Sequence, residues 1–178
     1  MTWEWSILLI YTLALGFIFF FSLIQLNLVF NFWAKRKRLE KNTIPPKNME
    51  DEDLPFVTIQ LPLYNEKYVV ERLIDCMAEL DYPKDKFEIQ VLDDSTDETT
   101  EIVHRKEMEY QSKGMNLHLI RRPERTGYKA GALKYGLELA KGKYIAIFDA
   151  DFLPSADFLK KMIPYLESDE KLGVVQSR

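Results

Sequence analysis

The chain has 178 residues, a length that suits one folded domain with an appendage, and 47% of its residues are hydrophobic. Its net charge of −4 excludes the strongly basic composition typical of nucleic-acid-binding proteins, so no nucleic-acid partner is expected. A single cysteine, Cys76, excludes an intrachain disulfide and suits a small core residue.

The first element is an uncharged apolar stretch that runs from Trp5 to Ala34. About twenty apolar residues are enough to cross a bilayer as a helix. Trp3 and Trp33 lie near its two ends, where tryptophan is common at membrane interfaces. The start of the chain carries an acid and no base, unlike a secretory signal peptide. Residues 1–34 are therefore predicted to form one retained N-terminal transmembrane helix.

A basic flank follows this stretch and contains Lys35, Arg36, Lys37, Arg38 and Lys41. The positive-inside rule places such a flank in the cytoplasm, so everything after Ala34 is predicted to be cytoplasmic, at a cell (inner) membrane crossed by a single span. Residues 42–55 are polar, acidic and contain prolines, which is typical of a linker. Residues 35–55 are thus predicted to be a flank and linker, and residues 56–178 a folded domain.

Strand and helix patterns alternate through this domain. Runs rich in β-formers predict strands at 56–61, 87–92, 117–120, 144–148 and 172–176. Apolar residues at helical spacing lie between them, at Val70, Leu73, Ile74 and Met77, at Ala130, Leu133 and Leu137, and at Phe158, Leu159, Met162 and Ile163. Ser95 and Glu98 form a capping-box pattern that predicts another helix toward Gln111. The alternation predicts an α/β fold, a mostly parallel sheet with helices on both faces.

Polar residues follow each of the first four predicted strands. The sequences are PLYNE (62–66), DDSTD (93–97), RRPERTGYKAG (121–131) and Asp149-Ala150-Asp151. In parallel α/β sheets ligands bind beyond the carboxyl ends of the strands. These four segments are therefore expected to share one rim and to form the binding site.

Asp149 and Asp151 give the strongest single signal on that rim. One acid after a strand could simply cap the next helix, but two together form a hard-oxygen site for Mg²⁺ or Mn²⁺, which usually binds phosphates as well. The spacing does not fit an EF-hand, because Pro154 and Lys160 stand where glycine and glutamate are required. It does not fit a phosphatase with an aspartyl nucleophile, whose acids follow the first strand. No dinucleotide-binding or P-loop glycine motif is present in the sequence.

Four motifs together resemble a known family. They are LPLYNE, VLDDSTD, GYKAGAL and FDADF, and they occur in the order and approximate spacing of family 2 glycosyltransferases with a GT-A (Rossmann-like) fold. The segments QVLDDSTD and GYKAGALKYG are most similar to the cellulose synthase-like and β-mannan synthase-like branch. The resemblance covers residues 56–178.

The resemblance implies a nucleotide-sugar site made of Pro62, Tyr64, Asn65, Glu66, Asp93, Asp94, Lys129 and Asp149. Pro62 and Tyr64 would pack on the base, in a loop shaped by Asn65 and Glu66. Asp94 would hydrogen-bond the base, and Asp93 would hold the turn.

The same resemblance implies a phosphate and metal site on the neighbouring strand ends. Lys129 would act on the diphosphate together with the N-terminus of its helix. Asp149 would contact ribose and metal, and Asp151 would ligate the metal, Mg²⁺ or Mn²⁺.

The implied function is that of a membrane-anchored inverting glycosyltransferase, which transfers a hexose from GDP-mannose or UDP-glucose to a growing β-glycan. The alternatives are a non-catalytic nucleotide-sugar-binding subunit, with a synthase complex as partner, and a transferase with a lipid-linked polyprenyl-phosphate acceptor. The sequence leaves the donor sugar and the base open.

The sequence departs from the family in one respect. The Thr-Glu-Asp-like motif that carries the family's catalytic base, and the Gln-x-x-Arg-Trp motif of processive members, are not found in it. The base is therefore expected beyond Arg178. On this interpretation the chain is the donor-binding front part of the enzyme and makes no polysaccharide alone.

Overall fold

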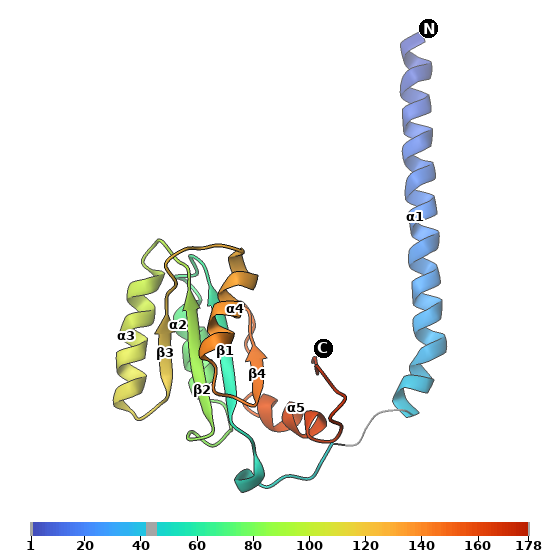
Figure 1. Cartoon of the computed structure of the whole chain (residues 1–178). Coiled ribbons are helices and arrows are strands. Elements are labelled where there is room, and N and C mark those ends of the chain that lie inside the picture. Colours follow the sequence, from blue (N-terminus) through green and yellow to red (C-terminus); the bar gives the residue numbers. More distant parts are fainter. Residues whose placement is uncertain (1, 42–45, 178) are drawn as a thin grey trace. The chain divides into compact units, whose positions relative to one another are not determined.

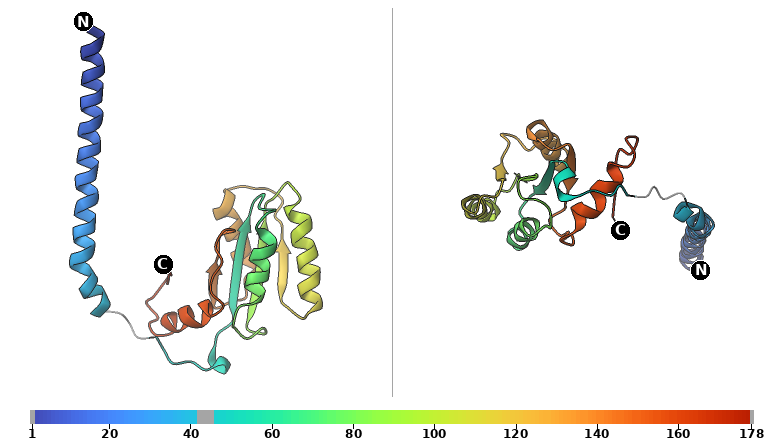
Figure 2. Two further views of the ribbon diagram at one scale, coloured as in Figure 1. Left: turned by 180° about the vertical axis from the view of Figure 1, so that it is seen from behind. Right: turned by 90° about the horizontal axis from the view of Figure 1, so that it is seen from below.

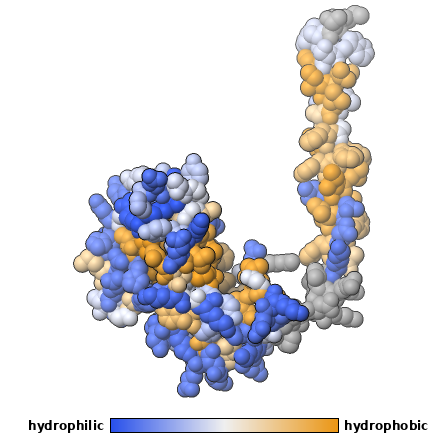
Figure 3. Space-filling model, in the orientation of Figure 1, coloured by the Kyte–Doolittle hydropathy of each residue, from blue (hydrophilic) through white to orange (hydrophobic). Residues whose placement is uncertain are grey.

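The computed structural model describes residues 2–41 and 46–177, in two compact units, Met1–Pro45 and Pro46–Arg178. The first unit is one helix, α1 (Thr2–Lys41), and its segment Trp3–Lys35 is long and apolar enough to cross a membrane. Its exposed side chains are mostly apolar, with polar ones between them toward both ends (Figure 3). A signal sequence near an N-terminus has the same features.

The predicted linker is only partly irregular. Helix α1 continues through the basic flank to Lys41, and a short 3-10 helix, η1, covers Asp51–Asp53. Residues 42–45 and the side chains of residues 36–41 lie outside the part of the chain that the structure describes.

The second unit is built on a parallel four-stranded sheet (Figure 1). Its strands are β1 (Val57–Leu63), β2 (Phe87–Asp93), β3 (Leu117–Ile120) and β4 (Tyr144–Ile147), in the order β3-β2-β1-β4. The helices are α2 (Val70–Ala78), α3 (Thr99–Ser112), α4 (Tyr128–Leu139) and α5 (Phe158–Leu166). The predicted α/β class and the first four predicted strands are confirmed.

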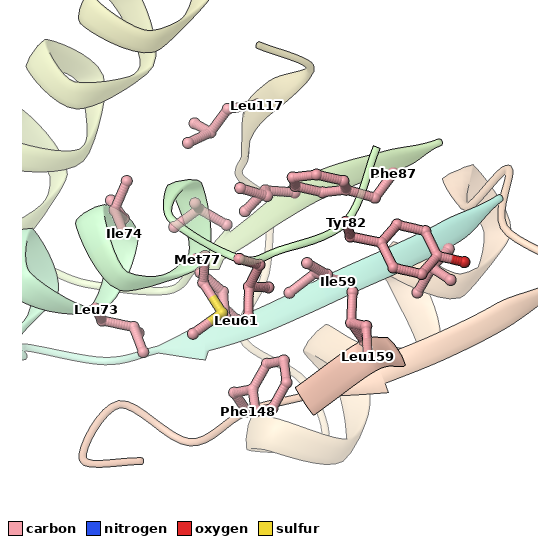
Figure 4. Packing of buried hydrophobic residues seen from close by; sticks show 14 of the residues in the cluster. Ile59, Leu61, Leu73, Ile74, Met77, Tyr82, Phe87, Leu117, Phe148 and Leu159 are labelled. Carbon is pink, nitrogen blue, oxygen red and sulfur yellow. The ribbon is translucent and has the colours of Figure 1, made fainter. Parts of the chain in front are cut away.

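Helices cover both faces of the sheet, as predicted. Seen along the strands, α2, α3 and α5 lie on one face and α4 on the other (Figure 2). The first face is apolar, because alternate residues of β1 and β2 turn into one core that also holds Met77, Phe148 and Leu159 (Figure 4). This core fixes the strands whose ends form the rim.

On β1 and β2, the face under α4 carries the buried polar side chains Thr58, Gln60, Glu88 and Gln90. The hydroxyl of Thr58 donates to Glu88 Oε1 (2.7 Å), and the amide of Gln60 donates to Gln90 (3.0 Å). Glu88 also accepts the backbone N–H of Lys141 at 2.8 Å, so it ties the connection between α4 and β4 to the sheet. Buried polar groups of this kind need partners, and here they find them across neighbouring strands.

The fifth predicted strand, at 172–176, is wrong. The structure has irregular chain there, and Val174 is 79% exposed. Residues 174–176 face β4 across a cavity of about 230 Å³ and do not pair with it. A β-rich run forms a strand only when it reaches hydrogen-bonding distance of an edge, and this segment does not.

The helix predicted toward Gln111 is present as α3, but the capping box expected at its start is wrong. Helix α3 begins at Thr99, and Asp97 accepts its backbone N–H at 3.0 Å. The hydroxyl of Ser95 is instead the acceptor for the N–H of Asn65 (2.9 Å), and the carboxylate of Glu98 pairs with Lys67. Both side chains of the expected box therefore have partners in another loop.

An ion-pair network joins α2 to α3 beneath the rim. The ammonium of Lys106, which is nearly buried, lies 2.8 Å from Asp75 Oδ1, and the hydroxyl of Tyr110 donates to the same oxygen at 2.6 Å. Burial opposes ionisation of Asp75, but the hydrogen bonds from Lys106 and Tyr110 outweigh it, and the pKa of Asp75 lies below its ordinary value. Bonding to Asp75 likewise raises the pKa of Lys106.

We predict that Lys106→Met destabilises the domain by about 2 kcal/mol, because the charge-assisted hydrogen bonds to Asp75 are lost. Since the pKa of Asp75 is lowered on folding, its contribution is present above its unfolded pKa and is lost as the pH falls through its folded pKa. The difference in the free energy of unfolding between wild type and variant should therefore become smaller at acidic pH. Urea unfolding followed by circular dichroism measures it.

The control is Lys113→Met, which removes an exposed ion pair with Glu109 and should cost less than about 0.5 kcal/mol. A Lys106→Met variant as stable as the wild type at neutral pH would show that the network contributes nothing.

Candidate functional site

The carboxyl ends of β1, β2 and β4 meet at one edge of the sheet. Leu63 is in register with Asp93 at the ends of β1 and β2, and the N–H of Phe148 donates to Gln60 on the other side of β1. A pocket of about 430 Å³ opens there. Its lining includes the predicted residues Pro62, Tyr64, Glu66, Asp94, Lys129, Asp149 and Asp151, and also Arg125, which the sequence analysis did not single out.

Two predicted site residues lie behind this pocket and hold its loops. Asn65, in the left-handed region at φ 58°, accepts the N–H of Thr96 at 2.9 Å. Asp93 is buried and accepts the N–H of Ser95 (3.0 Å) and the hydroxyl of Thr100 (2.6 Å). The Asn65 bond joins the loops that follow β1 and β2, and the Asp93 bonds tie the second of these loops to α3. Asn65 and Asp93 therefore position the pocket wall and do not line it.

Asp94 is held by an arginine that the sequence analysis missed. Arg122 donates from Nε to Asp94 Oδ1 at 2.8 Å and from Nη2 to Oδ2 at 2.6 Å, and both side chains are over nine-tenths buried. The hydrogen bond to Asp94 raises the pKa of Arg122, so the guanidinium stays charged. A carboxylate has about four acceptor positions, so Asp94 retains capacity toward the pocket.

Arg125 lies over the aromatic platform of the pocket. Its guanidinium carbon is 3.3 Å from the centre of the Tyr64 ring and 5.2 Å from that of Tyr128. Its Nε is 3.8 Å from Asp94. A planar cation therefore covers the ring face on which a flat aromatic ligand would stack.

Lys129 and Asp149 form an ion pair across the pocket. Lys129 stands in the first turn of α4, whose free N–H groups favour an anion. Its ammonium is about half exposed, as is the carboxylate of Asp149, so both remain accessible to a ligand.

The candidate ligands for a cation are Asp149 and Asp151, which both line the pocket. No group of three or more His, Cys, Asp or Glu side chains that could hold a metal occurs among residues 2–41 and 46–177. Two accessible carboxylates fit a hard cation such as Mg²⁺ or Mn²⁺, which takes its other ligands from water and substrate phosphates. Both acids also border a second cavity, of about 420 Å³, together with Phe152 and Gln176.

The sequence contained a signal for the missed arginines. Three arginines, at 121, 122 and 125, follow β3 directly, at the edge where the acids were expected. Acids that lie close together at the rim need basic side chains nearby to balance their charge. The spacing of the arginines in the sequence does not show which arginine pairs with which acid.

The fold and the pocket define the class of protein. A parallel α/β sheet with an aromatic ring, basic side chains and an Asp-x-Asp pair at its strand ends is typical of proteins that handle phosphorylated nucleotides. The family model described as "Glycosyl transferase family 2" matches residues 58–178, and the chain belongs to this family.

Within this family, the chain is similar to glucomannan mannosyltransferases of plants. The chain is 43% identical over 153 residues to glucomannan 4-beta-mannosyltransferase 1 of Cyamopsis tetragonoloba, which covers 84% of the chain and 27% of that protein. It is 37% identical over 181 residues to glucomannan 4-beta-mannosyltransferase 7 of Arabidopsis thaliana, covering 96% of the chain and 33% of the relative. The chain thus spans about a third or less of the length of these relatives.

Solved structures share the fold. The mannosyltransferase PcManGT from Pyrobaculum calidifontis, in complex with GDP-Man and Mn²⁺, superimposes with a TM-score of 0.67 at 34% identity, over 78% of this chain and 39% of that one. S. aureus TarS 1–349 in complex with UDP gives a TM-score of 0.53 at 29% identity, over 60% and 30% of the two chains. The GT-A fold is confirmed.

We predict that Asp94→Asn lowers the stability of the domain by about 3 kcal/mol, because it leaves the buried guanidinium of Arg122 without its counter-charge. Thermal unfolding followed by circular dichroism measures the change. The control is Glu124→Gln, at an exposed position of the loop that carries Arg122, and it should change stability by less than about 0.5 kcal/mol. Equal stability of Asp94→Asn and wild type would contradict the structural role of the pair.

Proposed function

We propose that this chain is the membrane-anchored, donor-binding part of an inverting glycosyltransferase that takes mannose from GDP-mannose for a growing β-glycan. The observation that carries the proposal is the pocket that brings Tyr64, Asp94, Lys129, Asp149 and Asp151 together. The names of the relatives and the GDP-Man in the PcManGT structure support mannose and guanine over glucose and uracil.

In the proposed complex the base takes the position beside Tyr64. An aromatic ring stacks on a base with about 1–3 kcal/mol, and this requires Arg125 to move aside or to stack on the opposite face of the base. Asp94 accepts hydrogen bonds from the base through the positions that Arg122 leaves free. Pro62 and Glu66 close the wall of the pocket.

Lys129 is proposed to bind the diphosphate. Its present partner is Asp149, so a diphosphate competes with that carboxylate for the ammonium. A bound Mg²⁺ or Mn²⁺ would supply charge neutralisation for the leaving nucleoside diphosphate. Asp149 and Asp151 would hold it, and Lys129 would stabilise the charge that develops on the phosphate as the glycosidic bond breaks.

The second cavity is proposed for the sugar and its acceptor. It meets the donor pocket at Lys129, Asp149 and Asp151, where the sugar carbon attached to the diphosphate would lie. Phe152 is partly exposed and stacks on Phe148, so it offers an apolar ring of the kind that packs on a pyranose face. A glycan or a lipid-linked sugar fits this description equally well.

We predict that GDP-mannose binds to the chain in detergent with Mn²⁺ and that EDTA weakens binding. Asp151→Asn should remove the metal-dependent part, a loss of about tenfold, because it deletes a proposed metal ligand. Isothermal titration with and without EDTA measures both effects, and UDP-glucose, titrated in parallel, should bind more weakly.

The matched control is Asp85→Asn, which changes an exposed acid in the loop before β2, at the opposite edge of the sheet. Affinity that is the same with Mn²⁺ and with EDTA would overturn the metal assignment. No binding of either nucleotide sugar to the wild type would overturn the proposed function.

Anchoring is proposed from α1, with the domain in the cytoplasm because a basic flank follows the apolar segment. In a Cys76→Ala background, Lys113→Cys should resist an impermeant thiol reagent added to intact cells and react after lysis. Trp3→Cys, at the other end of the apolar segment, should react in intact cells. Labelling of Lys113→Cys from outside would reverse the proposed topology.

A further inference from the structure

We propose that Arg122 is a positioning residue for the donor site, and that it holds the turn that aims Lys129 into the pocket. The inference rests on the proposed function, because it assigns Lys129 to the diphosphate. It adds a residue that is not itself required to touch the donor.

The side chain of Arg122 is hydrogen-bonded to the backbone of the turn that precedes α4. Besides Asp94, its guanidinium donates to the carbonyl of Thr126 (2.5 Å) and to that of Tyr128 (2.9 Å). These two carbonyls lie on either side of Gly127. One buried side chain therefore joins the acid after β2 to the backbone that enters α4.

The turn to which Arg122 is bonded, at Gly127 and Tyr128, has an unfavourable backbone conformation. Gly127 has φ 69°, and Tyr128 follows with φ 48°. A left-handed conformation suits glycine, but for a residue with a side chain it is strained and needs support from its surroundings. Lys129 is the next residue, so the conformation of this turn sets where its ammonium points.

Gly131 gives a second, independent sign that this contact is built in. A Cβ at position 131 would lie 2.0 Å from the oxygen of Thr126 and 2.4 Å from Nη1 of Arg122. Any side chain there would displace the carbonyl or the guanidinium. The first turn of α4 has room for the arginine only because position 131 is glycine.

The chain of contacts links three strand ends. Asp94 follows β2, Arg122 follows β3, and Lys129 reaches Asp149 after β4. If the hydrogen bonds of Arg122 to the turn are lost, Tyr128 relaxes toward right-handed conformations and Lys129 leaves the pocket. The affinity that is lost is then that of the contact between Lys129 and the diphosphate.

The test compares GDP with GMP, because GMP lacks the second phosphate. In the full chain in detergent with Mg²⁺, Arg122→Lys should weaken GDP about tenfold, since a charge-assisted contact is lost, and GMP by less than about threefold. Adding Tyr128→Gly should return GDP affinity to within about threefold of wild type, because glycine adopts positive φ without support. A global loss of structure would not be rescued in this way.

Two further variants keep the test decisive. Tyr128→Val leaves the buried pair intact and raises the strain, and it should produce the same selective loss of GDP. Arg121→Lys, beside Arg122, changes a half-exposed arginine that bonds Ser95 and should alter GDP affinity less than about twofold.

Three results would overturn the inference: unchanged GDP affinity in both Arg122→Lys and Tyr128→Val, equal losses of GDP and GMP, or no rescue by Tyr128→Gly in a variant whose melting temperature matches its parent. Failure of the wild type to bind GDP at all would count against the proposed function, so the two failures are distinguishable.

Discussion

The buried ion pair between Asp94 and Arg122 is the interaction on which the rim depends. Taking two charges out of water costs several kcal/mol for each, and attraction offsets this only where the geometry is good and the remaining hydrogen-bonding groups are satisfied. The geometry is good because the pair is bidentate, and Arg122 donates two further N–H groups to the carbonyls of Thr126 and Tyr128. A rigid link between β2 and the turn before α4 is the result.

Charge balance explains why acids can gather at this edge. Asp94 has Arg122 as its partner and Asp149 has Lys129, whereas Asp151 has no ion pair among the residues that the structure describes. The rim is therefore one cation short on the side of the Asp-x-Asp pair. In the proposed function, Asp149 and Asp151 would hold a divalent ion that supplies this charge, and Lys129 would bind the phosphate.

The sequence predicted the first four strands, their order of appearance and the rim, because alternating apolar patterns and polar strand ends are local signals. It could not predict which partner each polar side chain takes. Ser95 was expected to cap a helix and instead accepts from Asn65. Arg121 and Arg122 are indistinguishable in sequence, yet one is half exposed and the other is buried against Asp94. The run at 172–176 has strand composition but does not reach the edge of β4.

The two faces of the sheet have different consequences for the site. The apolar face is held by non-directional packing, but the face under α4 is held by hydrogen bonds that fix one register, such as Gln60 with Gln90. Helix α4 lies close to that face because position 136 is glycine, where a Cβ would come within 2.7 Å of Gln60. The close approach at Gly136 and the bond from the N–H of Lys141 to Glu88, just after the helix, leave α4 little freedom to slide. Lys129 stands in the first turn of α4. The position of its ammonium in the pocket therefore depends both on the packing of α4 against the sheet and on the hydrogen bonds of Arg122 to the turn before the helix.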